Sequence, residues 1–229
     1  MARVIGILPA RGGSKRVARK NLHLLGGYPL IAWVLRAAQK TSLDALVVST
    51  DDGEIAQVAE QYYGVRVLSR PPELAQDETP DLPVFLHALS ELGTGMDDLI
   101  LHLRATSPLV QPEDIESVIR LARHVTPSSV LSIREVRDPP HKMYYDGVWL
   151  RSLMPSGHAP NSPSQFLTPR VWAAAGYLDA IPARVIYGGR MEQDPVPWLP
   201  PMANILDLDT EEDFERAEAM IAQYGYAPV

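Results

Sequence analysis

Short apolar runs alternate with helix-period segments along most of the chain, and this alternation constrains the fold more than any other feature. Runs of strand length occur at 4–8, 46–48, 65–68, 99–103 and 130–133. Between them, apolar residues recur every three or four positions, as on one face of a helix. This order predicts an α/β fold with an open, mostly parallel sheet flanked by helices.

The regular pattern weakens between about 139 and 201, where prolines cluster and aromatic residues gather. We interpret this stretch as an inserted subdomain within one domain of residues 1–229. The pattern returns with a strand predicted at Asn204–Leu208. Thr210 then opens a last helix, with Asp213 three residues on as in a capping box.

Composition excludes several classes of protein. The 229 residues contain no Cys, so disulfide frameworks, thiolate zinc sites and cysteine nucleophiles are ruled out. A net charge of −7 argues against a general nucleic-acid-binding protein. No window approaches the roughly 18 apolar residues of a membrane span, and the first residues do not resemble a signal peptide. We expect a cytoplasmic protein without nucleic-acid or membrane partners.

A cationic loop follows the first predicted strand. Five of the 21 Lys and Arg residues lie within positions 11–20: Arg11, Lys15, Arg16, Arg19 and Lys20. Gly12 and Gly13 allow a turn that brings backbone N–H groups close to anionic oxygens. Ligands of open α/β sheets bind at the carboxyl ends of strands, so this loop indicates a polyphosphate site. A solvated basic face is the alternative. The chain has neither the P-loop nor the dinucleotide-binding glycine pattern.

The segment Ala10–Arg16, followed by Lys20 and Asn21, resembles the signature loop of the acylneuraminate cytidylyltransferases, or CMP-sialic acid synthetases. The similarity continues in the same order at 48–52, 70–75, 87–89, 106–109, 113–115 and 207–211. It covers residues 3 to about 135 and 203–221. The resemblance implies a Rossmann-like nucleotidyltransferase domain. It also implies that the stretch at about 139–201 serves dimerisation and acceptor binding in a homodimer.

The resemblance further implies a Mg²⁺-dependent reaction in which a sugar hydroxyl attacks the α-phosphorus of CTP. Pyrophosphate leaves and a CMP-sugar forms. The positions that match the family's catalytic residues are Arg11, Lys20, Asp207 and Asp209. The nucleotide-binding positions are Leu8, Ala10, Arg11, Gly12, Gly13, Ser14, Lys15, Lys20, Asn21 and Arg70. For Arg70, a surface arginine before a proline turn is an equal alternative.

Asp207 and Asp209 are separated by two residues, a spacing that places both carboxylates on one face of a strand. Paired carboxylates suit a hard cation such as Mg²⁺, which also takes substrate phosphates as ligands. The alternative is a pair of polar residues that cap the following helix. Members of the family have metal-binding acids here, so we predict that both residues bind Mg²⁺.

Departures from the family gather where the acceptor sugar should bind. Arg104 and Ala105 stand where the family usually has Gln-Pro, and the usual Arg before Gln165 and Asn before Gly176 are missing. Since Arg binds carboxylate or phosphate in a two-pronged way, we expect Arg104 to meet an acceptor anion. The predicted acceptor-binding residues are Arg104, Thr106, Ser107, Lys142 and Gln165.

Three functions therefore stay open at this point. The first is a cytidylyltransferase that activates a nonulosonic (sialic-type) acid. The second keeps the reaction but uses another acceptor, such as a sugar phosphate or phosphonate, or another nucleoside triphosphate. The third is a nucleotide-binding protein without catalytic turnover.

Overall fold

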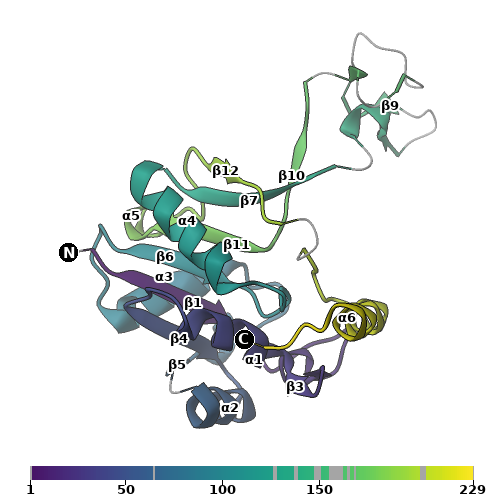
Figure 1. The fold of residues 1–229 in the computed structure, drawn as a ribbon. Coiled ribbons are helices and arrows are strands. Elements are labelled where there is room, and N and C mark those ends of the chain that lie inside the picture. The colour runs from purple at the N-terminus through teal and green to yellow at the C-terminus, as the bar shows by residue number, and fades with distance from the viewer. Residues whose placement is uncertain are drawn as a thin grey trace.

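The computed structural model describes residues 2–63, 65–125, 128–136, 139–146, 151–154, 162–163, 166–167, 169–201 and 205–228. Within them, eight strands form one sheet (Figure 1). Its strands are β1 (Val4–Pro9), β4 (Ala45–Thr50), β5 (Arg66–Ser69), β6 (Leu99–Leu103), β7 (Val130–Glu135), β10 (Trp172–Ala174), β11 (Leu178–Pro182) and β12 (Val196–Trp198). The main helices are α1 (Leu30–Gln39), α2 (Gly53–Tyr63), α3 (Asp81–Leu92), α4 (Pro112–Val125), α5 (Ala183–Tyr187) and α6 (Glu211–Tyr224).

The strand order is β10-β7-β11-β6-β1-β4-β5, with β12 beside β7. Strands β6, β1, β4 and β5 are parallel, and only β10 and β11 run against their neighbours. The chain winds outward from β1 to β5 and then crosses to β6 on the other side of β1. Strands β1 and β6 therefore flank a topological switch point, where ligands of open α/β sheets bind. This confirms the predicted fold class.

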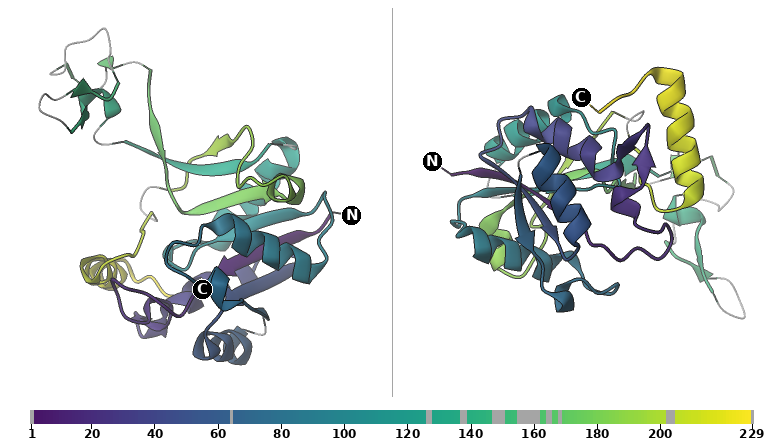
Figure 2. Two further views of the ribbon diagram at one scale, coloured as in Figure 1. Left: turned by 180° about the vertical axis from the view of Figure 1, so that it is seen from behind. Right: turned by 90° about the horizontal axis from the view of Figure 1, so that it is seen from below.

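Helices cover both faces of the sheet (Figures 1 and 2). Helices α1, α2 and α4 bury Ile31, Ile55 and Ile115 in the core on one face. Helices α3 and α5 bury Phe85 and Ile186 on the other. Among the described residues, no helix has the length and apolar character needed to cross a membrane.

The sequence between 139 and 201 is divided in the structure. Residues 172–198 return to the main sheet, where β11 is inserted between β6 and β7. Only the earlier part, which contains 3-10 helix η3 (Pro140–Lys142) and the pair β8 (Tyr144–Tyr145) and β9 (Arg151–Ser152), stands away from the body (Figures 1 and 2). We call the described residues of 139–170 the arm. The insertion that leaves the sheet is thus shorter than the sequence suggested.

Helix α6 begins as predicted, since Thr210 and Asp213 form a capping box. It packs with the pair β2 (Leu24–Leu25) and β3 (Tyr28–Pro29) around a small cluster that includes Phe214. The strand predicted at Asn204–Leu208 is wrong for the described residues 205–208, which are in no strand. They pack on the body through Leu206 and Leu208, and the N–H of Leu208 donates to the carbonyl of Thr106 at 3.0 Å.

Candidate active site

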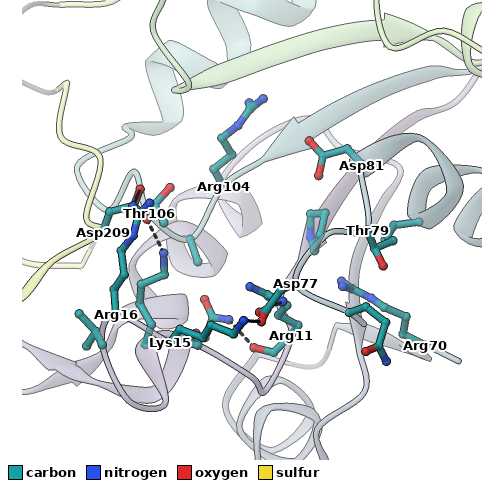
Figure 3. Close-up of a pocket in the computed structure, with 18 of the residues that line it drawn as sticks. Arg11, Lys15, Arg16, Arg70, Asp77, Thr79, Asp81, Arg104, Thr106 and Asp209 are labelled. Carbon is teal, nitrogen blue, oxygen red and sulfur yellow. Dashed lines mark hydrogen bonds and ion pairs between the residues drawn. The ribbon is translucent and has the colours of Figure 1, made fainter. Parts of the chain in front are cut away.

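A cavity of about 550 Å³ opens at the carboxyl ends of β1 and β6 (Figure 3). Its walls come from the loop after β1, the segment between β5 and α3, the end of β6, and Asp209. Six cationic and three acidic side chains line it: Arg11, Lys15, Arg16, Lys20, Arg70, Arg104, Asp77, Asp81 and Asp209. The excess of cations suits a polyphosphate, because anions are attracted to a concave site lined by positive charge.

The cationic loop forms one side of this cavity. Arg11 Nη1 lies 2.6 Å from Asp77 Oδ1, and Lys15 Nζ is paired with the other oxygen of the same carboxylate. The contact with Lys15, assisted by Arg11, lowers the pKa of Asp77. Lys20 Nζ and Arg16 Nη1 bind Asp209 at 2.7 and 3.0 Å. Each acid therefore holds a pair of cations in place beside the cavity.

The fifth cation, Arg19, faces another way. Its guanidinium binds Asp52 at 3.2 Å and Glu54 at 3.0 Å, at the start of α2. Arg19 has a left-handed backbone (φ 50°, ψ 40°), which non-glycine residues adopt only at a cost. It precedes the 3-10 helix η1 (Lys20–Leu22), so this turn sends Arg19 outward while its neighbour Lys20 lines the cavity.

The glycines of the loop serve a different purpose from the one expected. The N–H of Gly12 donates to Asp51 at 3.0 Å rather than facing the cavity. A Cβ at Gly12 would lie 2.5 Å from Asp52 Oδ2, so only glycine allows this approach. Gly13 is exposed, whereas Leu8 and Ala10 are buried in the core. None of these four predicted nucleotide-binding residues lines the cavity.

Ser14 and Asn21, by contrast, do line it. Asn21 is buried, and its side-chain amide donates to the carbonyl of Arg11 at 2.9 Å. That bond closes the loop on itself and fixes the backbone from which Arg11 projects.

Arg70 is a cavity residue and not a surface arginine. It is buried, and its guanidinium donates to the hydroxyl and carbonyl oxygens of Ser49 at 3.1 and 2.6 Å. Burial lowers its pKa, while the charges of Asp51 and Asp81 act in the opposite direction. The two bonds to Ser49 hold the guanidinium at the end of the cavity remote from Arg16 and Asp209 (Figure 3).

The predicted acceptor residues are only partly brought together. Arg104 and Thr106 line the cavity, and Arg104 Nη1 also binds Asp179 at 2.9 Å. Ser107 is buried and donates to the carbonyl of Gly176 at 3.1 Å, so its hydroxyl supports the wall instead of lining it. Lys142 is exposed on the arm and does not line the cavity. Gln165 falls outside the described residues.

The two predicted metal ligands face different spaces. Asp209 lines the main cavity, whereas Asp207 lines a second cavity of about 670 Å³ with Arg134 and Arg216. The expectation of one shared face is wrong, because residues 205–208 lack the strand on which it depended. Within the described chain, no three His, Cys, Asp or Glu side chains cluster as a metal site made of protein alone. Asp209 still fits an Mg²⁺ ion that takes substrate phosphates as its other ligands.

Five polar residues of the cavity escaped the sequence analysis as site residues: Gln76, Asp77, Thr79, Asp81 and His102. The first three come from the segment between β5 and α3, which carries no periodicity, and Asp81 is the first residue of α3. His102 lies on β6 among apolar residues, where a polar side chain was the available signal. Burial, assisted by the charge of Arg104, lowers the pKa of His102 well below 6.5, so the imidazole is neutral.

An open α/β sheet with a cationic cavity at its switch point is the arrangement of a nucleotide-binding enzyme. The chain belongs to the cytidylyltransferase family, whose model matches residues 5–139.

The chain is 31% identical over 237 residues to N-acylneuraminate cytidylyltransferase B of Danio rerio, covering 96% of this chain and 52% of that protein. It is 36% identical over 160 residues to CMP-N,N'-diacetyllegionaminic acid synthase of Legionella pneumophila, covering 68% of this chain and 65% of that protein. The chain thus spans about half the length of the first relative and less than two thirds of the second.

The fold is also similar to a solved structure of CMP:2-keto-3-deoxy-manno-octonic acid synthetase in complex with CTP. The TM-score is 0.70 at 18% identity, over 97% of this chain and 99% of that one. This likeness supports the fold described above.

Proposed function

We propose that this chain transfers the cytidylyl group of CTP to a sugar acid. A hydroxyl oxygen of the acceptor bonds to the α-phosphorus, the bond from that phosphorus to pyrophosphate breaks, and the hydroxyl proton is lost. The observation that carries the proposal is the cationic loop, which directs Arg11, Lys15, Arg16 and Lys20 to one cavity in a chain of the cytidylyltransferase family.

Positioning and charge neutralisation are the main tasks of a protein in phosphoryl-group transfer. The four loop cations bind the triphosphate and stabilise the charge that develops on pyrophosphate as it leaves. Asp77 and Asp209 hold these cations before the nucleotide binds, through the contacts of Arg11 and Lys20 among others. Phosphate oxygens then replace carboxylate oxygens as partners of cations that already lie at the cavity wall.

Mg²⁺ is the metal that this donor chemistry supports best. Asp209 would hold the ion together with substrate phosphates. Asp207 stays a ligand predicted from the sequence, although it lines the second cavity. When bound, the ion would neutralise phosphate charge and lower the pKa of a coordinated hydroxyl.

The acceptor is a nonulosonic, sialic-type acid in this proposal. The names of the relatives contain N-acylneuraminate, N,N'-diacetyllegionaminic acid and 3-deoxy-manno-octulosonate, which are all sugar acids. Arg104 is the residue that we expect to bind the acceptor carboxylate, since it lines the cavity between Asp209 and Asp81 (Figure 3). The same guanidinium supports a sugar phosphate or phosphonate as the second candidate.

We also propose a homodimer formed through the arm. Tyr145 and Phe166 are 59% and 60% exposed there, and Tyr144 and Met143 are exposed beside them. A group of exposed aromatic residues on a projecting segment is typical of an interaction surface. In this proposal, Lys142 binds the acceptor of the second copy from the arm, since it does not line the cavity of its own chain. Light scattering should give twice the chain mass, and a monomeric mass would contradict this part of the proposal. The cytoplasmic location stays a prediction.

Neighbouring cations of the loop provide a matched test. Lys20→Met removes a cation that lines the cavity, whereas Arg19→Met removes one that faces α2. We expect Lys20→Met to lower the rate of CTP-dependent pyrophosphate release by about a hundredfold or more, as for loss of a group that stabilises transition-state charge. The rate of pyrophosphate release by Arg19→Met should stay close to that of the unchanged chain. Equal loss in both variants would show that only the net charge of the loop matters.

A further inference from the structure

The cavity has a second end, away from the loop cations Lys15, Arg16 and Lys20. Figure 3 shows Arg70, Thr79 and Asp81 on the side opposite Arg16 and Asp209. Pro9, Leu74 and Val84 add apolar surface to the lining. Apolar side chains among polar groups suit a flat heterocyclic ring, whose faces are apolar and whose edge carries hydrogen-bonding atoms.

His102 is the most buried polar side chain of the cavity wall. It is 4% exposed, and its ring packs edge-on against Phe85 with centroids 4.7 Å apart. Neither ring nitrogen makes a hydrogen bond to any residue that the structure describes; the nearest charged oxygen is Asp81 Oδ2, 3.9 Å from Nε2. The Asp81 carboxylate is therefore the charged neighbour of this imidazole, within reach of a small shift of the exposed Asp81 side chain.

Asp81 stands beside His102 at the first residue of α3. Its side chain is 55% exposed, and its carboxylate accepts no hydrogen bond within the described part of the chain. A carboxylate only accepts hydrogen bonds, so a ligand atom placed against it must be a donor. Arg70, whose pKa the charge of Asp81 tends to raise, is the nearby donor. This edge of the cavity therefore presents an acceptor and a donor to the same ligand.

We propose that Asp81 is a specificity-determining residue for the nucleobase and accepts a hydrogen bond from the 4-amino group of cytosine. The inference rests on the proposed use of CTP. His102 is a positioning residue, because its Nε2 can donate to Asp81 and hold the carboxylate toward the base. Uracil has a carbonyl oxygen where cytosine has the amino group, so the same carboxylate repels UTP.

The test compares the binding of CTP and UTP to the full chain by calorimetric titration, without an acceptor. The two triphosphates carry the same phosphate charge, so the ratio of their dissociation constants reports on the base alone. Asp81→Asn provides an amide that can donate to O4 of uracil. We expect this variant to lower the preference for CTP over UTP by about tenfold or more.

Glu78→Gln is the matched control, since Glu78 is exposed in the same loop and does not line the cavity. It should keep the CTP preference of the unchanged chain. His102→Phe keeps the ring packing on Phe85 but removes both nitrogens, and should lower the preference partly. If His102 had only a structural role, His102→Phe would weaken the binding of CTP and UTP equally and leave the ratio of their dissociation constants unchanged.

The outcomes separate this inference from the proposed function. If the unchanged chain prefers CTP and Asp81→Asn keeps that preference, the inference is overturned and the proposed function stands. If the unchanged chain binds neither nucleotide, or binds both equally, the proposed use of CTP is contradicted. The proposed role of Asp81, which rests on it, is then contradicted as well. A preference that collapses in Asp81→Asn but not in Glu78→Gln supports both.

Discussion

Replacement of Arg104 by glutamine should affect both the stability of the fold and the binding of the acceptor. Arg104 Nη1 lies 2.9 Å from Asp179 Oδ2, with Arg104 25% and Asp179 9% exposed in their side chains. The other oxygen of Asp179 accepts from the backbone N–H and hydroxyl of Ser132 at 2.9 and 3.0 Å. Among the described residues, the buried carboxylate of Asp179 would then keep only Ser132 as a hydrogen-bond partner.

The stability loss follows from that burial. Removing one partner of a fully buried ion pair costs about 3–5 kcal/mol. Because a quarter of the Arg104 side chain is exposed, we expect a smaller loss of about 2 kcal/mol in the free energy of unfolding. Urea titration of Arg104→Gln against the unchanged chain measures it.

The functional loss follows from the place of Arg104 in the cavity wall. Hydrogen bonds to a charged group contribute about 1.5–3 kcal/mol, so loss of the contact with an acceptor carboxylate should raise the acceptor KM by about ten- to a hundredfold. Pyrophosphate release at saturating CTP, with the acceptor varied, gives this KM.

The double variant Arg104→Gln/Asp179→Asn separates the two effects. It removes the unpaired carboxylate as well as the guanidinium, so stability should recover while the acceptor KM stays high. An Arg104→Gln protein that loses stability but keeps its acceptor KM would refute the reasoning. Arg104 would then serve only to neutralise Asp179.

Three further predictions concern the cavity and its support. Asp77→Asn should tighten CTP binding in calorimetry, because Arg11 and Lys15 are then free for phosphate; unchanged or weaker binding would contradict the proposed exchange of partners. Thr210→Ala should lower the free energy of unfolding by about 1 kcal/mol through loss of the helix cap, with CTP affinity unchanged. His102, whose pKa is well below 6.5, stays neutral in the folded chain while the unfolded chain takes up a proton. The free energy of unfolding should therefore fall as pH decreases from 6.5 toward the lowered pKa, by up to about 1.4 kcal/mol per pH unit. His102→Gln should flatten this slope in urea titrations at several pH values; an equal slope in both proteins would contradict the assignment.

The local signals of the sequence were sufficient for most elements of the sheet and for the cationic loop. Helix α6 begins where the Thr210 cap predicted, and α2 begins after Asp52, whose carboxylate accepts from the N–H groups of Glu54 and Ile55. Such signals act over a few residues, so they can be recognised without knowledge of the fold.

Non-local pairing accounts for the elements that the sequence did not reveal. Strand β11 lies between β6 and β7. It pairs with β6 across 75 or more residues of sequence, as in Asp179–His102, and with β7 across about 50 residues, as in Ala180–Val130. The prolines around this strand weaken the sequence pattern, so the strand was not predicted. Likewise, Asp207 and Asp209 line different cavities because residues 205–208 form no strand. The N–H of Leu208 instead donates a backbone hydrogen bond to the carbonyl of Thr106.

The acidic partners of the site were also beyond local reasoning. Asp77 belongs to a loop whose shape depends on the fold around it, and Asp81 begins α3 directly after that loop. Each became a candidate only when Arg11 or His102 was seen beside it. Arg16 and Arg19 have the same charge in the sequence, and only the fold shows that Arg16 lines the cavity while Arg19 pairs with Asp52 and Glu54.

The most direct test of the proposed function is pyrophosphate release by the unchanged chain with Mg²⁺. Each of the four ribonucleoside triphosphates is paired with a panel of nonulosonic acids, sugar phosphates and phosphonates. We predict release with CTP and a nonulosonic acid, and with no other pairing. Release with another pairing would support nucleotidyl transfer but contradict the proposed nucleotide or acceptor. Binding of CTP without release for any acceptor would contradict cytidylyl transfer and favour a nucleotide-binding role.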